Sequence, residues 1–134
     1  MSPAFSWPVR IYYEDTDAGG IVFYANYLKF FERARTEWLR AAGVNQQALA
    51  EEDGAIFVVK RASIDYHAPA KLDDVLNLTL SIEKLGQASV QFIQQAWRGE
   101  VLLATASVKV GCVDAVTLRP RSLPPASAAK MRAA

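Results

Sequence analysis

Hydrophobic positions in the first third of the chain follow the period of a helix. Between residues 24 and 42 they recur at steps of three and four, and Gly43 follows as a helix stop. The stripe is broad for a surface helix, so we expect other structure to cover this helix on more than one side. A short second helix is expected over 45–52. The apolar positions of the long helix are Tyr24, Tyr27, Leu28, Phe31, Ala34, Trp38 and Ala41.

Five further segments have the pattern of strands. Segments 9–14 and 56–66 are rich in β-branched and aromatic residues, and 75–83 alternates apolar with polar side chains throughout. Two more, 89–97 and 101–113, follow glycine turns. In the last segment the side chains expected on the apolar face are Leu102, Ala104, Ala106, Val108 and Val110.

Together these elements predict an α+β fold. Strands that alternate apolar and polar side chains form an antiparallel sheet with one apolar face, and a single long helix is available to cover that face. We therefore expect a five-stranded antiparallel sheet wrapped around one long central helix. All of 1–134 is expected to form one domain. Within it, 118–134 is predicted to be a basic, Pro- and Ala-rich tail, irregular apart from one helical turn at its end.

Composition and charge exclude several classes of function. With 15 basic and 14 acidic residues the net charge is +1, so no general field attracts nucleic acid or an anionic membrane. The single cysteine, Cys112, cannot form an internal disulfide, and no Cys/His cluster has the spacing of a zinc site. The N-terminus lacks the pattern of a signal peptide, and no apolar run is long enough to span a bilayer. We expect a cytoplasmic protein without a metal or other cofactor.

An acidic cluster precedes the long helix. Glu14, Asp15 and Asp17 lie within four residues, and Gly19 and Gly20 separate them from the helical segment. A carboxylate in this position can cap free N–H groups, lie beside an anion site, or react. Spacing alone leaves these three roles open.

The stretch around this cluster, YYEDTDAGGIVFYANYLKFFERARTEWL, resembles the signature of the hotdog-fold acyl-CoA thioesterases of the 4-hydroxybenzoyl-CoA thioesterase type. It is most similar to the Tol-Pal-associated acyl-CoA thioesterase branch. The family pattern runs through Asp-x-Asp-x-x-Gly-[Ile/Val]-Val to x-[Asn/Ser]-Tyr and the helix, and the later VVKRASIDYHAPAKLDDVL also resembles this branch. The signature is matched by Asp15, Asp17, Gly20, Ile21, Val22, Phe23, Tyr24, Asn26 and Tyr27.

This resemblance implies an enzyme that hydrolyses the thioester of an acyl-CoA. Because a thiolate leaves readily, the reaction needs an attacking oxygen and a stabiliser for the oxyanion rather than a strong acid. Asp17 is expected to supply the first, as nucleophile or general base, and backbone N–H groups at the helix start near Tyr24 the second. Gly19 and Gly20 let the chain turn closely enough to bring the two together. Substrate contacts are expected from Gly20, Val22, Phe23, Tyr27, Lys60 and Arg61.

Two departures from the family pattern bear on the substrate. Many members of the branch have His where this chain has Tyr24. Some relatives carry an arginine-rich turn that holds the CoA phosphates, whereas this chain has KLGQAS at 84–89, in which only Lys84 is basic. We therefore expect the nucleotide end of CoA to contribute modestly to binding, through Lys60, Arg61 and the basic tail. Acyl-pantetheine and acyl carrier protein are then further candidate substrates.

Other roles are open to the same residues. Asp17 could cap the loop before the helix, and Asp15 is expected to be a structural acceptor that orders it. His67, the one histidine, is expected to have a surface or hydrogen-bonded role. A hotdog hydratase or dehydratase would need an Asp/His pair, and no histidine lies near Asp17 in the sequence. From another class, the alternative is a non-catalytic module that binds an acyl thioester or an acyl carrier protein.

The resemblance also implies a homo-oligomer, with a dimer as the minimum and a tetramer expected. In such assemblies the sheets join edge to edge, and each site lies at the subunit boundary. Independently, a long uncovered edge strand is a liability that pairing removes. An association with the Tol-Pal system of the cell envelope is implied by the resemblance alone.

Overall fold

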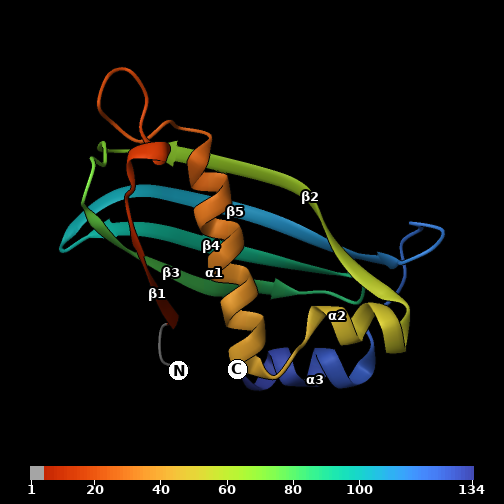
Figure 1. Ribbon diagram of the computed structural model, residues 1–134. Helices are drawn as coiled ribbons and strands as arrows, with labels where there is room; N and C mark the ends of the chain where they lie inside the picture. The colour runs from red at the N-terminus through yellow and green to blue at the C-terminus, as the bar shows by residue number, and fades with distance from the viewer. Residues whose placement is uncertain (1–4) are drawn as a thin grey trace.

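The computed structural model describes residues 5–134, in which an antiparallel sheet curves around one long helix (Figure 1). The sheet has five strands in the order β1-β3-β4-β5-β2. The strands are β1 (Phe5–Arg10), β2 (Ala55–Tyr66), β3 (Val75–Leu85), β4 (Ser89–Arg98) and β5 (Val101–Asp114). The helical elements are a 3₁₀ turn η1 (Tyr13–Asp15), α1 (Asn26–Ala42), α2 (Gln46–Ala48), a π-helical turn η2 (Leu49–Asp53) and α3 (Pro125–Ala133). This arrangement confirms the predicted α+β fold.

Helix α1 crosses the apolar face of the sheet and forms the centre of the core (Figure 1). Trp38 packs edge-on against Phe92 of β4, with ring centroids 5.7 Å apart. Gly43 ends the helix with a φ of +90°, as the glycine stop predicts. Leu28, a member of the predicted stripe, is 48% exposed, so one flank of α1 is uncovered in the single chain. The buried residues of α1 are Tyr27, Phe30, Phe31, Ala34, Trp38 and Leu39.

A polar link fastens α1 to the sheet. Gln94 of β4 is fully buried, donates to the Phe31 carbonyl at 2.9 Å, and accepts from the Arg35 guanidinium at 3.0 Å. Burial lowers the pKa of Arg35, and the neighbouring Glu32 acts in the opposite direction. Because a buried amide must keep both of its partners, this link sets how α1 lies over β4.

The first strand lies earlier in the chain than predicted. β1 ends at Arg10, whereas the pattern predicts a strand over 9–14. Beyond it the chain leaves the sheet and forms η1, in which the Asp15 carboxylate accepts the Tyr12 N–H at 2.9 Å. The strand preference of the two tyrosines there is overridden by this local bond between side chain and backbone.

Strand β5 departs from strict alternation at one point. Its register with β4 shifts between Ala96 and Trp97, so that Leu103 becomes the extra residue of a bulge. Leu103 is fully buried, and Leu102, which was expected on the apolar face, is only partly buried. From Ala104 onward the predicted alternation is confirmed.

Residues 118–124 are irregular, as expected, but the segment after them is a helix, so the expectation of a single helical turn there is wrong. α3 has nine residues and a proline in its first turn, where proline favours a helix instead of breaking it. Ala128 and Met131 are buried, and the Lys130 ammonium donates to the Gly43 carbonyl at 3.1 Å. α3 therefore docks on the end of α1, a contact that no local pattern could reveal.

Candidate active site

A tight turn carries Asp17 out to the surface, in the loop before α1 (Figure 1). The Asp17 N–H donates to the Ile21 carbonyl at 2.9 Å, and the Gly20 N–H donates to the Asp17 carbonyl at 3.0 Å. Gly20 has a φ of +79°, which residues with a side chain rarely adopt. Thr16 and Val22 pair across the base of the turn. The turn therefore favours glycine at position 20.

The Asp17 carboxylate has one oxygen engaged and one free. Its Oδ1 accepts the Gly19 N–H at 2.8 Å. A Cβ at Gly19 would lie 3.2 Å from this oxygen, so glycine leaves room for the contact. Within residues 5–134 Oδ2 accepts no hydrogen bond, and the side chain is exposed beside a depression lined by Tyr13, Thr16 and Leu72. One oxygen thus has a capping role, and the other is available to water or to a thioester.

Asp15 orders the loop, which confirms its predicted structural role. Its carboxylate accepts the Tyr12 N–H at 2.9 Å. Its carbonyl accepts the Phe23 N–H at 3.0 Å and the Asn26 side-chain amide at 2.8 Å. These bonds tie the acidic segment to the first residue of α1, so Asp17 and the helix start belong to one connected unit.

The start of α1 leaves backbone donors free. The helix begins at Asn26, two residues later than predicted, and Ala25 at its N-cap position has no side-chain acceptor for them. In the part of the chain that the structure describes, the N–H groups of Tyr24 and Ala25 have no hydrogen-bond acceptor. The Tyr24 carbonyl is held by the Tyr66 hydroxyl at 2.7 Å. Free N–H groups at the positive end of a helix are suited to hold an oxyanion.

Tyr66 is a candidate site residue that the sequence does not reveal. Its ring centroid lies 6.1 Å from that of Tyr24 and 5.4 Å from that of Tyr27. Burial, and then the neighbouring Tyr24, raise the pKa of Tyr66, so its hydroxyl stays a donor at neutral pH. Alternation places Tyr66 on one face of its strand with Ile64, but only the sheet's path around α1 brings it to Tyr24, 42 residues away.

The predicted substrate contacts within the signature divide by burial. Gly20 and Phe23 lie at the surface of the loop, and Phe23 is 43% exposed. Val22 and Tyr27 are core residues, 5% and 2% exposed. In the single chain the side chains of this second pair support the site from below and do not line its surface.

The other two predicted contacts, Lys60 and Arg61, lie along β2. Arg61 lies five positions before Tyr66, which is about 17 Å at the rise of a strand. Both side chains are exposed. Within one chain the structure therefore does not bring them into the aromatic cluster beside Tyr24.

Lys84 and Lys109, which were not predicted as substrate contacts, lie in line with Arg61 across the sheet. Arg61 pairs with Lys109 of β5, which pairs with Gln91 of β4, which in turn pairs with Lys84 of β3. Lys60 is the extra residue of a bulge in β2. None of these cations forms an ion pair with a carboxylate within residues 5–134. We call Lys60, Arg61, Lys84 and Lys109 the basic row; alternation of polar positions was the one signal for it in the sequence.

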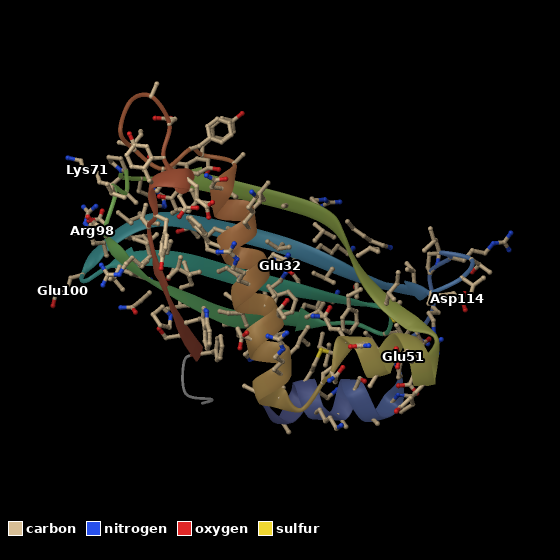
Figure 2. The ribbon with its side chains drawn as sticks, in the orientation of Figure 1. Glu32, Glu51, Lys71, Arg98, Glu100 and Asp114 are labelled. Carbon is tan, nitrogen blue, oxygen red and sulfur yellow. The ribbon has the colours of Figure 1, made fainter. Side chains whose placement is uncertain are left out.

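Contacts of Arg98 hold residues 69–74, the segment that lies next to the Asp17 turn. Ile21 of the turn forms a bridge with Lys71. Arg98 donates to the Pro69 carbonyl at 2.9 Å and pairs with the Asp74 carboxylate at 3.1 Å. Lys71 and Arg98 lie at the end of the sheet that carries the loop, as Figure 2 shows. These contacts join the loop before α1 to the turn between β4 and β5.

The remaining candidate groups have partners of their own. His67 Nε2 lies 3.2 Å from the Thr105 hydroxyl, which confirms its hydrogen-bonded role. Cys112 is buried, with its sulfur 3.8 Å from the Ser122 carbonyl. Across residues 5–134, no three His, Cys, Asp or Glu side chains are grouped so that they could hold a metal ion. No helix in this range has the length and apolar character that crossing a membrane requires.

Comparison with known proteins decides the family. The sequence model of the thioesterase superfamily matches residues 19–105. This chain belongs to the thioesterase superfamily. Among its thioesterase relatives, the acyl-CoA thioesterase YbgC of Haemophilus influenzae is 50% identical over 124 residues, which are 92% of this chain and 91% of that protein. The acyl-CoA thioester hydrolase YbgC of Escherichia coli is 47% identical over 129 residues, 96% of each chain.

Solved structures of thioesterases share the fold. A probable thioesterase from Bartonella henselae, 36% identical, matches with a TM-score of 0.86 over 91% of this chain and 100% of that one. A 1,4-dihydroxy-2-naphthoyl-CoA thioesterase from Synechocystis, 23% identical, has the same fold with a TM-score of 0.88. These matches confirm the predicted hotdog fold, and the YbgC relatives confirm the expected branch of the family. The link to the Tol-Pal system itself stays a prediction.

Proposed function

We propose that this thioesterase-superfamily protein hydrolyses acyl-CoA thioesters in the cytoplasm, with Asp17 and the N–H groups at the start of α1 as its catalytic groups. One observation carries the proposal: within residues 5–134, a carboxylate with a free oxygen and backbone donors without acceptors occur in one hydrogen-bonded segment. The YbgC relatives named as acyl-CoA thioesterases, at 50% and 47% identity over almost the whole chain, support the same reaction here.

The chemistry follows from these two kinds of group. An oxygen attacks the thioester carbonyl carbon, the carbonyl electrons move to its oxygen, and the N–H groups of Tyr24 and Ala25 hold that oxyanion. The C–S bond then breaks with its electrons on sulfur, and CoA leaves as a thiolate that takes up a proton. As a base, Asp17 removes a proton from the attacking water; as a nucleophile, it forms an acyl anhydride that water then hydrolyses. Heavy oxygen from labelled water recovered in Asp17 after one turnover would identify the nucleophile route.

A homodimer along β2 is part of the proposal. β2 is the last strand of the sheet, and an unpaired strand edge favours pairing with another. Two apolar side chains of this strand are exposed in the single chain: Val59 is 52% exposed and Tyr66 45%. A second copy that pairs antiparallel along β2 covers them and places each site at the boundary. Two such dimers would form the expected tetramer.

The basic row is the proposed contact for the phosphates of CoA. Its four cations lack carboxylate partners within residues 5–134, so their charge is available to an anionic ligand. The row replaces the arginine-rich turn that some relatives have near Lys84. An acyl carrier protein presents the same pantetheine thioester and is the second candidate carrier of the acyl group.

A turnover assay separates this function from its alternatives. We expect the purified protein to release free thiol from at least one member of a panel of aliphatic and aromatic acyl-CoAs. Binding of an acyl-CoA or acyl carrier protein without thiol release by any of them would favour the non-catalytic module. Water addition to or loss from the acyl chain, with the thioester intact, would favour the hydratase or dehydratase.

A further inference from the structure

Two cavities meet at one side chain of α3. The first, of about 140 Å³, lies between α1, β2, β4 and β5. The second, of about 900 Å³, is a wide groove between α1, β3, β4 and the end of α3. Met131 lines both of them. It is 2% exposed, and it therefore forms part of the wall that separates the two spaces.

The first cavity has an exposed mouth and a buried apolar inner wall. Glu32, which lies midway along α1 (Figure 2), and Val59, which is 52% exposed, stand at its open side. Leu39, Phe92 and Met131 form its inner wall, and each of them is at most 5% exposed. The mouth thus opens beside the uncovered edge of β2, while the inner end is closed by core residues.

We propose that the first cavity receives the acyl group of the substrate and that Met131 limits its depth, so that the enzyme selects short acyl groups. This inference rests on the proposed thioesterase function and its β2 dimer. An apolar cavity of about 150 Å³ holds a molecule the size of benzene. A cavity of about 140 Å³ therefore takes one ring or a chain of about six carbons.

The β2 dimer explains how this cavity reaches the catalytic groups. If β2 pairs antiparallel with itself about its midpoint, Phe57 at the cavity lies opposite Ile64 of a second copy. Ile64 is two residues from Tyr66, which holds the Tyr24 carbonyl. The cavity of one copy therefore serves the Asp17 and Tyr24 of the other, and neither site is complete in a single chain.

Met131→Ala tests the depth limit. The change removes the side chain beyond Cβ from the dividing wall and joins the small cavity to the large groove. Each methylene that gains apolar contact adds about fourfold in binding, so two or more extra methylenes add about tenfold or more. We expect the ratio of kcat/KM for palmitoyl-CoA to that for butyryl-CoA to rise by about this factor. Met131→Leu, which keeps the volume, is expected to keep the wild-type preference for butyryl- and hexanoyl-CoA.

Two further variants keep the test decisive if Met131→Ala does not fold. Thr36 lines the first cavity and is half-buried, so Thr36→Met is tolerated at the surface of α1 and fills part of the cavity. We expect the ratio of kcat/KM for hexanoyl-CoA to that for butyryl-CoA to fall. Leu85→Ala enlarges the second cavity alone and is expected to leave the preference among acyl-CoAs unchanged.

Three outcomes overturn the inference. A wild-type preference for palmitoyl-CoA, or an unchanged acyl profile in folded Met131→Ala or in Thr36→Met, refutes the depth limit while hydrolysis itself upholds the proposed function. Absence of hydrolysis with every acyl-CoA refutes the proposed function and this inference with it.

Discussion

At the scale of single residues, the candidate site consists of groups whose neighbours leave one position open. One carboxylate oxygen of Asp17 accepts the Gly19 N–H, and the other accepts no hydrogen bond from residues 5–134. The Tyr66 hydroxyl binds the carbonyl of Tyr24 and not its N–H, so the donor side of that residue stays open. Asp15 makes the bonds that order the loop, to the Tyr12 N–H and to the Asn26 side chain. This division between supporting and free groups distinguishes Asp17 from its acidic neighbour and leads to two predictions.

Asp17→Asn should remove most of the activity and keep the fold. The amide oxygen can still accept the Gly19 N–H, but the side chain can neither attack the thioester nor take a proton from water. Loss of a positioned base costs about 10²–10⁴-fold in rate, and a weakened cap costs about 1 kcal/mol of stability. Measuring kcat and Tm on one preparation separates the two effects. Asp15→Asn, which keeps an acceptor for the Tyr12 N–H, is the matched control and should retain turnover. A variant at Asp17 that keeps more than about a tenth of wild-type kcat removes this residue from the mechanism.

Tyr66→Phe should slow the reaction without unfolding the protein. It removes the bond from the Tyr66 hydroxyl to the Tyr24 carbonyl and loosens the orientation of the Ala25 N–H in the same peptide group. We expect kcat to fall about tenfold, less than the roughly 10²–10³-fold for loss of a direct oxyanion donor, with KM almost unchanged. Tyr27→Phe is the control, since its hydroxyl does not bond to Tyr24. Equal kinetics in both variants would show that the Tyr66 bond has no part in catalysis.

At the scale of elements, register decides which charges meet. Arg61, Lys109 and Lys84 come from three strands and lie in one line because each pairs through its neighbour across the sheet. Like charges on adjacent strands repel, so such an arrangement lowers stability slightly unless an anion shares it. The basic row is therefore the face on which to look for a phosphate.

Lys109→Glu combined with Arg61→Glu should raise KM for acyl-CoA and leave acyl-pantetheine unaffected. Exposed charge contacts contribute about 0.2–1 kcal/mol each, so two reversals should raise KM by about threefold to tenfold at low salt. The kcat should stay unchanged because neither side chain touches the reacting atoms. Arg33→Glu combined with Arg40→Glu, the same charge change at exposed positions of α1 outside the basic row and the basic tail, serves as the control. An equal rise in KM for both substrates would show that the row does not bind the nucleotide end.

At the scale of the whole molecule, one edge of the sheet and the apolar side chains beside it are uncovered in the single chain. Within residues 5–134 the edge of β2 has no partner strand, and Val59 and Tyr66 expose apolar surface beside it. The cavity under Glu32 opens toward this edge, and Tyr66, which holds the Tyr24 carbonyl, lies at the end of β2. Assembly, catalysis and acyl selection are thus proposed to share one surface.

Val59→Asp should therefore disrupt assembly and activity together. A charge on an edge strand opposes pairing with a second strand, because it would be buried in the interface without a partner. We expect sedimentation to show a dimer or tetramer for the wild type at micromolar concentration and a folded monomer, with kcat/KM lowered about a hundredfold or more, for the variant. Val116→Asp, at a loop position that is 89% exposed, is the control. A wild-type monomer with full activity would contradict the shared site.

The sequence by itself determined the elements whose signals are local. The period of three and four, with its glycine stop, specifies α1 to within two residues at its start, and the Asp17–Gly20 turn depends on bonds between near neighbours. The signature in the same segment was enough to indicate the family. Local signals misled where a local bond opposed a propensity, as Asp15 did by ending β1 early.

Only the tertiary structure decided the contacts that join distant parts of the chain. Tyr66 reaches Tyr24 across 42 residues, and Met131 comes to line the cavity under α1 because α3 docks there. The bulges at Lys60 and Leu103 each add one residue to a strand and break strict alternation there, so that Leu103 is buried in place of Leu102. Such contacts depend on the packing of the whole sheet around α1, which no window of the sequence contains.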